Sequence, residues 1–328
     1  MDNHSLSIFR YPLSTFHHPL FQTRLMKNKI LLFLLPLSIL ASQTFAQKSL
    51  LDELGKDEET IDYVKSSFKT NRIINMHSLE NTAEGVLDFK ISHRFGVVDQ
   101  GIYDLFGTDA ATQRMGFDYG ITDNLCIGVN RNSVHKALDG FVKYRILRQS
   151  TGKVNMPITL SFLSSMALET QKFTDLSREN YFSSRLFYTN QLLIGRKFND
   201  IFSLELAPTV VHRNLVKTTA DKNTVFAMGI GGRIRLNRRT TFNAEYTYVL
   251  PNQLTGQYAN CLSIGFDIET GGHVFQLHFT NSESMSEYSY ITQTEYPWGK
   301  NAVRFGFNVS RVFTIYETAN NKKKEISK

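Results

Sequence analysis

Apolar and polar residues alternate with a period of two in twelve stretches of the chain, which together extend from residue 86 to residue 316. In the first stretch the apolar set is Leu87, Phe89, Ile91 and Phe95, and the polar set is Asp88, Lys90, Ser92 and Arg94. This is the period of a β-strand with one apolar and one polar face. An even number of such strands predicts a closed antiparallel up-and-down β-barrel, with its apolar faces in lipid and its polar faces lining a lumen.

The connections between these stretches alternate between short and long. Short connections follow the even-numbered stretches, at residues 122–124, 149–153, 199–200, 237–239 and 271–272. Connections after the odd-numbered stretches are mostly longer, as at residues 97–110, 169–180, 216–223, 251–259 and 281–300. Short periplasmic turns and long external loops are typical of outer-membrane barrels. We therefore predict a twelve-stranded outer-membrane barrel over residues 86–316, with its short turns in the periplasm.

The N-terminal region has the three parts of a secretory signal peptide. Lys27 and Lys29 precede an apolar run over residues 30–40, and a small-residue cleavage site ends at Ala46. The apolar run is too short for a membrane-spanning helix. Residues 26–46 are thus predicted to direct export and to be cleaved near Ala46. Residues 1–25 are then a leader extension or lie upstream of the true start, and residues 317–328 form a charged C-terminal tail.

Residues 47–85 differ from the rest of the chain. Apolar residues recur at roughly helical spacing over residues 48–68, namely Leu50, Leu51, Leu54, Ile61 and Val64. This spacing predicts a short amphipathic helix. Residues 69–84 have no clear period and resemble a linker. We expect residues 47–85 to be a periplasmic segment, and insertion into the barrel as a plug is the alternative.

Charge and cysteine content exclude several classes of protein. Residues 1–46 hold four of the 37 basic and one of the 30 acidic residues, so the remainder has a net charge of +4. No basic run is interleaved with aromatic residues, so nucleic acid is not an expected partner. Cys126 and Cys261 lie on the polar faces of distant strands and are expected to be unpaired. No cysteine or histidine spacing suggests a cofactor or a metal.

Charged residues are concentrated on the polar faces of the strands. The candidate lumen-lining residues are Asp88, Lys90, Arg94, Arg114, Asp118, Lys143, Arg145, Glu169, Arg185, Arg233, Arg235, Glu245, Asp267, Glu269 and Arg304. Charges in a confined lumen must be paired or hydrated. One interpretation is a salt-bridged interior that stiffens a structural barrel. The other is a narrow passive pore in which excess basic residues favour small anionic solutes.

Two further functions stay open. A membrane-embedded hydrolase would need a nucleophile and a positioned base, and its candidate histidines are His212, His273 and His278. Strand alternation does not place these histidines on one face, and no GxSxG motif occurs, so catalysis is not favoured. A cell-surface binding protein would instead use the aromatic residues of the loop at residues 281–300, which are Tyr288, Tyr290, Tyr296 and Trp298.

Four stretches of sequence carry a family resemblance. They are VLDFKISHRFG at residues 86–96, HRNLV at 212–216, GFDIETGGHVFQLHFTNS at 265–282 and RFGFNVSRVF at 304–313. They resemble a family of Gram-negative outer-membrane β-barrel proteins that is defined by sequence and has no assigned activity. The resemblance implies an outer-membrane location, with membrane lipid and the barrel-assembly machinery as partners. The charged tail means that Phe313 or Tyr316 would serve as the aromatic assembly signal from an internal position.

Overall fold

The computed structural model of the protein describes residues 60–317, apart from residues 174, 175, 178 and 257. Residues from Ile61 onward form one compact unit. The signal peptide and most of the predicted helix at residues 48–68 lie outside the described residues. The part of that helix which is described is not helical, because Ile61–Tyr63 form a short strand, β1.

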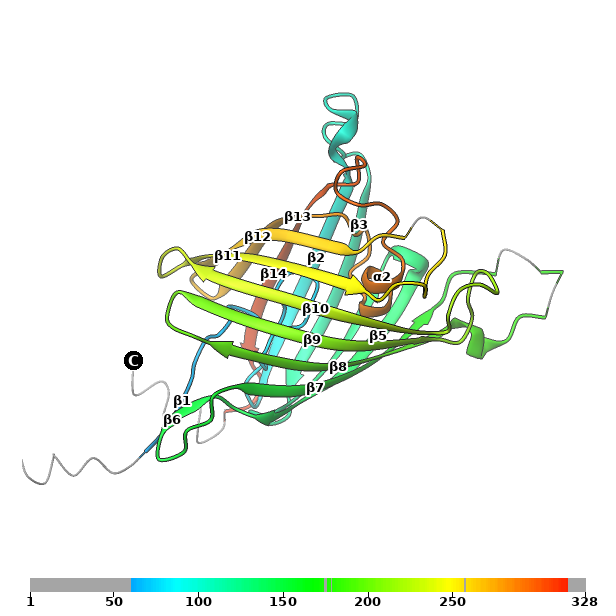
Figure 1. Cartoon of the computed structure of the whole chain (residues 1–328). Helices are drawn as coiled ribbons and strands as arrows, with labels where there is room; N and C mark the ends of the chain where they lie inside the picture. The colour runs from blue at the N-terminus through cyan, green and yellow to red at the C-terminus, as the bar shows by residue number, and fades with distance from the viewer. Residues whose placement is uncertain (1–59, 174–175, 178, 257, 318–328) are drawn as a thin grey trace, which may run out of the picture. The chain divides into compact units, whose positions relative to one another are not determined.

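The described residues form a closed antiparallel barrel of twelve strands (Figure 1). This confirms the predicted architecture. The strands are β2 (Val86–Val97), β3 (Ala111–Gly120), β4 (Leu125–Asn132), β5 (Ala137–Leu147), β7 (Thr159–Glu169), β8 (Leu186–Lys197), β9 (Phe202–Arg213), β10 (Thr224–Arg235), β11 (Thr240–Val249), β12 (Cys261–Thr270), β13 (His273–Thr280) and β14 (Arg304–Thr314). Each pairs with its neighbours along the chain, and β14 pairs with β2 to close the barrel.

The two ends of the barrel differ in their connections. At one end, here called the turn end, the connections are residues 121–124, 148–158, 198–201, 236–239 and 271–272. The second of these contains β6 (Ser150–Gly152), which pairs with β1 outside the barrel wall. At the other end, the loop end, the connections are residues 98–110, 133–136, 170–185, 214–223, 250–260 and 281–303. Three of them contain short 3-10 turns, at Val98–Gln100, Val134–Lys136 and Phe182–Arg185.

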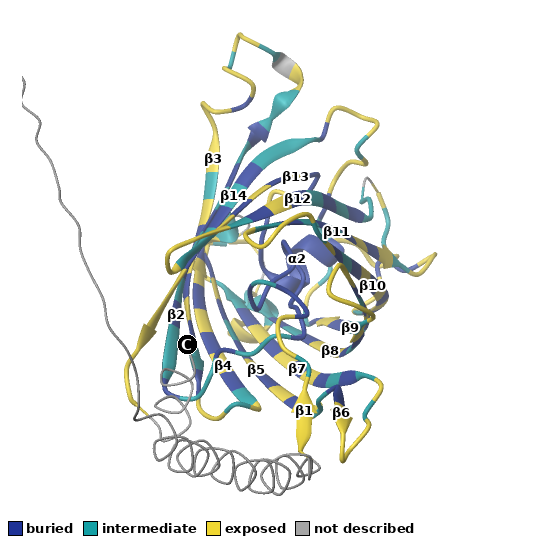
Figure 2. Cartoon of the chain, turned by 90° about the vertical axis from the view of Figure 1, so that its left-hand side faces the viewer, coloured by how far each residue is buried: buried dark blue, intermediate teal, exposed yellow. Residues whose placement is uncertain are grey.

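Buried and exposed residues alternate along the wall strands, as the sequence pattern predicts (Figure 2). On β12, for example, Phe266 is 44% exposed on the outer surface, whereas Asp267 is 1% exposed on the inside. This register puts apolar side chains where lipid lies and charged ones in the lumen, because a shift by one residue would exchange the two sets. None of the helices in the described part of the chain is long and apolar enough to cross a membrane.

The lumen is filled by two segments that are not part of the wall. Residues 67–79 are almost entirely buried inside the barrel, and so is α2 (Glu287–Thr292), which Figure 2 shows enclosed by the strands. Apolar residues of both segments pack in one cluster with inward-facing wall residues, including Leu193 and Val211. The expected periplasmic placement of residues 47–85 is thus corrected for residues 67–79. They form an internal plug, because their partners are lumen-facing side chains.

Candidate functional site

The plug enters from the turn end, and its apolar side chains fit against glycines of the wall. A Cβ atom at Gly231 would lie 2.3 Å from Cδ1 of Ile73, and one at Gly229 would lie 2.6 Å from Cε of Met76. Interiors are close-packed, so a side chain at Gly231 would compete directly with Ile73. The glycines on the inner face of β10 therefore act as sockets for this particular plug.

The deepest part of the plug, residues 71–77, is here called the tip, and a single carboxylate holds it. Glu245 on β11 accepts hydrogen bonds from three successive backbone N–H groups, those of Ile74 at 3.0 Å, Asn75 at 2.8 Å and Met76 at 3.0 Å. The side chain of Arg94 donates to Oδ1 of Asn75 at 2.8 Å. The tip forms no helix or strand, and its backbone polar groups are satisfied partly by the wall and partly within the plug, where the N–H of Ile73 donates to the carbonyl of Met76 at 2.8 Å.

The tip also contacts α2 from the loop end. Arg72 donates to Oε1 of Glu287 at 2.6 Å, and Nε2 of His77 lies 3.0 Å from the same oxygen. Burial acts to raise the pKa of the Glu287 carboxyl, but Arg72, His77 and Arg114 outweigh it and hold that pKa well below its usual range. Burial and the nearby Arg72 charge lower the pKa of His77 well below its ordinary value. The two inserted segments thus meet through an ionised Glu287 and a neutral His77.

Helix α2 is fixed inside the loop end by contacts with the wall. The ring of Tyr288 stacks on Phe187 with centroids 4.2 Å apart, and its hydroxyl donates to Glu169 at 3.1 Å. Tyr288 is 2% exposed and Tyr290 is fully buried. The hypothesis of a binding surface made of the loop aromatics is therefore wrong for these two tyrosines in this state, because they are part of the barrel interior.

The neck of the plug, here residues 65–66 and 78–80, is held at the turn end by basic side chains. Lys143 and Arg145 on β5 donate to backbone carbonyl oxygens of the neck, Lys143 to Ser78 at 3.2 Å and to Glu80, and Arg145 to Leu79 at 3.1 Å. Arg233 on β10 donates to the carbonyl of Ser66 at 2.6 Å. In the described part of the chain, none of these three cations forms an ion pair with a carboxylate. The neck carbonyls therefore accept their hydrogen bonds, while the carboxylate of Glu80 acts on Arg145 and Arg233 from a longer distance.

The predicted lumen residues divide into two groups. Ten are buried inside the barrel: Asp88, Lys90, Arg94, Arg114, Asp118, Lys143, Arg145, Arg233, Glu245 and Asp267. Lys90 pairs with Asp118 at 3.0 Å, and Arg114 pairs with Asp139. The other five lie near the ends, with Glu169, Arg185 and Arg304 at the loop end and Arg235 and Glu269 at the turn end. The structure thus brings the first group together around the plug and leaves the second group outside it.

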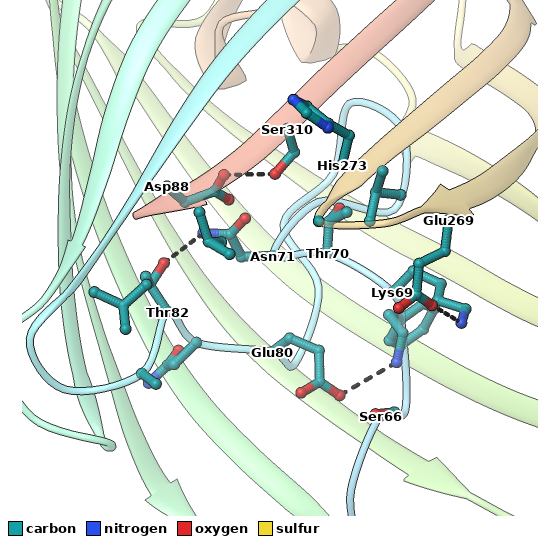
Figure 3. Close-up of a pocket in the computed structure, with 17 residues that line it drawn as sticks. Ser66, Lys69, Thr70, Asn71, Glu80, Thr82, Asp88, Glu269, His273 and Ser310 are labelled. Carbon is teal, nitrogen blue, oxygen red and sulfur yellow. Dashed lines mark hydrogen bonds and ion pairs between the residues drawn. The ribbon is translucent and has the colours of Figure 1, made fainter. Parts of the chain in front are cut away.

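A cavity of about 420 Å³ lies beside the plug at the turn end (Figure 3). Plug residues form one side of it and the β2, β12 to β14 wall forms the other. Ser310 donates to Asp88 at 2.5 Å, and Glu80 accepts hydrogen bonds from the backbone N–H groups of Ser67 and Phe68. Lys69 pairs with Glu269 at the rim. Because Ser66 and Glu80 line this cavity, it gives access to the neck from the turn end.

The predicted lumen residues included neither the plug contacts nor two buried acids of the wall, Asp139 on β5 and Glu205 on β9. Glu205 on β9 is fully buried and forms no ion pair within the described residues. Alternation on β9, where Ser203, Glu205 and Ala207 share the inner face, was the signal that could have identified it. For Arg72 and His77 there was no such signal, because the segment around them has no period.

The candidate histidines of a hydrolase do not converge. His212 faces outward on β9 and contacts the hydroxyl of Thr224 at 2.9 Å, whereas His278 is buried inside on β13. His273 lies at the turn-end cavity. Within the described residues, no group of three or more His, Cys, Asp or Glu side chains is placed to hold a metal ion. Both Cys126 and Cys261 are buried and unpaired.

Comparison with protein families gives one match. Residues 68–313 match the family described as membrane-bound β-barrel domain (DUF5777). The chain belongs to this family. The match includes most of the plug as well as nearly all of the barrel, so the family domain as matched contains both. It is thus a membrane-bound barrel protein.

Comparison with curated proteins found no match. Among solved structures, the NanC porin is 9% identical, covers 70% of this chain and 98% of its own, and superposes with a TM-score of 0.44. The KdgM porin is 10% identical, with coverages of 70% and 99% and a TM-score of 0.44. Omp33 of Acinetobacter baumannii is 9% identical, with coverages of 70% and 99% and a TM-score of 0.38.

Proposed function

We propose that the protein is an outer-membrane passive channel closed by its own plug, with its turn end in the periplasm. The observation that carries the proposal is how the plug is held. Glu245 accepts hydrogen bonds from the tip, and Lys143, Arg145 and Arg233 donate hydrogen bonds to the neck. Water can satisfy all of these polar groups when the plug leaves. Membrane lipid and the barrel-assembly machinery are the expected partners, and export through the signal peptide precedes assembly.

A barrel that needed only rigidity could fill its lumen with wall side chains. This barrel instead keeps glycine at the inner positions 229 and 231 and inserts a separate segment there. Such a segment can move without unfolding the wall, because the wall strands are hydrogen-bonded to each other and not through the plug. The tight fit of Ile73 at Gly231 favours a second candidate, a structural barrel with a permanent plug.

Conductance of purified protein in planar bilayers separates the two candidates. Ile73→Asp places a charge in the apolar cluster and should drive the plug out, giving persistent conductance where the unmodified protein opens rarely. Ile61→Asp is the matched control, because Ile61 is 37% exposed on β1 and lies outside the lumen. A folded Ile73→Asp barrel without conductance would support the permanent plug.

A reversible lock provides the converse test. The side-chain amide of Asn75 lies 3.8 Å from Sγ of Cys261, so Asn75→Cys places two thiols next to each other across the plug and the wall. Oxidation should abolish all opening, and a reducing agent should restore it. Unchanged opening with the disulfide formed would contradict the proposal that the plug is the gate.

A further inference from the structure

Three basic side chains at the neck donate hydrogen bonds to carbonyl oxygens, and the nearby carboxylate of Glu80, which interacts electrostatically with Arg145 and Arg233, belongs to the neck itself. Lys143 and Arg145 lie two residues apart on the inner face of β5 and are 0% and 8% exposed, and Arg233 on β10 is 2% exposed. Their hydrogen-bond acceptors in the plug are backbone carbonyls of residues 66 and 78–80. A carbonyl oxygen carries only a partial negative charge, whereas charge-assisted bonds to an oxyanion are stronger and an arginine can make two in parallel.

We propose that Lys143, Arg145 and Arg233 form a binding site for a small oxyanion, a carboxylate or phosphate solute, which the plug neck occupies in the closed state. The carbonyls of the neck stand where the anion oxygens bind. The solute therefore competes with the neck, so the same anion that the channel passes also promotes its opening. This inference rests on the proposed function and adds to it the class of solute and the means of regulation.

The surroundings of the site support this order of events. The turn-end cavity reaches the neck at Ser66 and Glu80, so an anion can approach while the tip is still bound (Figure 3). Glu80 belongs to the plug and moves away with it. Glu205 stays behind on the wall near Lys143, and once the plug has left and water reaches it, its negative charge opposes an anion at the site. Removing its charge should therefore strengthen the response to anions.

The two native cysteines report plug release without any added label site. Sγ of Cys261 lies 3.8 Å from the side chain of Asn75, so the tip covers it, and Sγ of Cys126 lies 3.7 Å from the hydroxyl of Thr82, in the segment that follows the neck. We would measure their rate of reaction with a water-soluble maleimide in citrate, and in sodium chloride of equal ionic strength. Citrate should speed the reaction by about tenfold, the equivalent of one charge-assisted bond of about 1.4 kcal/mol.

Variants of two arginines on β10 distinguish specific binding of the anion from general screening of charges by salt. Arg233→Gln removes a member of the site. It should raise the rate of maleimide labelling without citrate and make that rate depend less on citrate. Arg235→Gln is the matched control, because Arg235 is paired with Asp200 at 3.7 Å rather than with the plug. Glu205→Gln should increase the response to citrate.

Equal effects of citrate and chloride would overturn the inference, since screening depends on ionic strength alone. An identical citrate response in Arg233→Gln and Arg235→Gln would overturn it as well. The proposed function fails on a different result, the absence of conductance in folded Ile73→Asp, so the two failures can be told apart.

Discussion

Arg72 in the plug and Glu287 in α2 form a buried ion pair of 2.6 Å across 215 residues of sequence. It joins the segment that enters from the turn end to the loop that folds in from the opposite end. Both side chains are nearly inaccessible to solvent, so each depends on the other for charge compensation. A change that withdraws α2 from the lumen therefore weakens the binding of the plug. The two segments that fill the lumen are energetically coupled.

Loss of one partner of this pair should release the plug. Arg72→Met leaves Glu287 buried without its main cation, which costs about 3–5 kcal/mol in buried pairs. We expect faster maleimide labelling of Cys261 and a lower unfolding temperature. Glu283→Gln breaks the half-exposed pair with Arg304 at 3.4 Å and should change stability by less than about 1 kcal/mol. Similar losses from both substitutions would contradict a special role for the buried pair.

Acidification should favour the open state. His77 is neutral in the plug, so below its ordinary pKa of about 6.5 a released His77 takes up a proton that the plugged form does not. Glu287 acts in the same direction at lower pH, because its lowered pKa stabilises the plug fully only above the ordinary glutamate value of about 4.3. The neighbouring cations Arg72 and Lys143 further disfavour a charged His77.

Channel open probability should therefore rise between about pH 7.5 and about pH 5, the range of ordinary histidine titration. His77→Gln keeps a hydrogen-bond donor for Glu287 but removes the titration, so its open probability should be nearly constant over that range. A rise of the same size in His77→Gln would assign the effect to another group.

Adjacent glycines on β10 offer a sharp test of the sockets. Gly231→Val should displace the tip, because its Cβ would lie 2.3 Å from Ile73, and overpacking of this kind costs about 1–3 kcal/mol. Gly232→Val should be tolerated, since the nearest atom to its Cβ is 3.7 Å away. Conductance and thermal unfolding measure both effects. Ile73→Ala should rescue Gly231→Val, and failure of this rescue would argue against direct competition.

The proposed orientation can be tested on intact cells. Tyr103 at the loop end is 91% exposed, and Asn199 lies in an exposed turn at the opposite end. An impermeant maleimide should label Tyr103→Cys in intact cells and Asn199→Cys only after the outer membrane is permeabilised. The native cysteines are buried and give little background. The reverse labelling pattern would show that the turn end, and not the loop end, faces the cell exterior.

The wall could be predicted from the sequence because lipid imposes a strict rule on it. Every strand must present apolar side chains on one face, and the period of two records this directly, as at Phe266 and Asp267. Alternation also placed Glu245 and Arg233 inside the barrel. It could not identify what they bind, because their partners are backbone groups of the plug. Those partners depend on a segment without regular structure, for which no periodic signal exists. Ile61 was assigned to a helix by its spacing, yet pairing with Gly152 on β6 determines its conformation.

The plug is fastened at both of its ends. Before it, β1 pairs with β6, and after it, Gly85 is hydrogen-bonded to Gly120 at 2.9 Å and accepts a bond from Ile315 at 2.9 Å. Residues 64–84 are thus a tethered loop, and a released tip stays close to its sockets. Return is an intramolecular event at an effective concentration of the order of millimolar, the value typical of short flexible tethers. The plug can therefore close the channel again without a soluble factor, and the rate of closing does not depend on protein concentration.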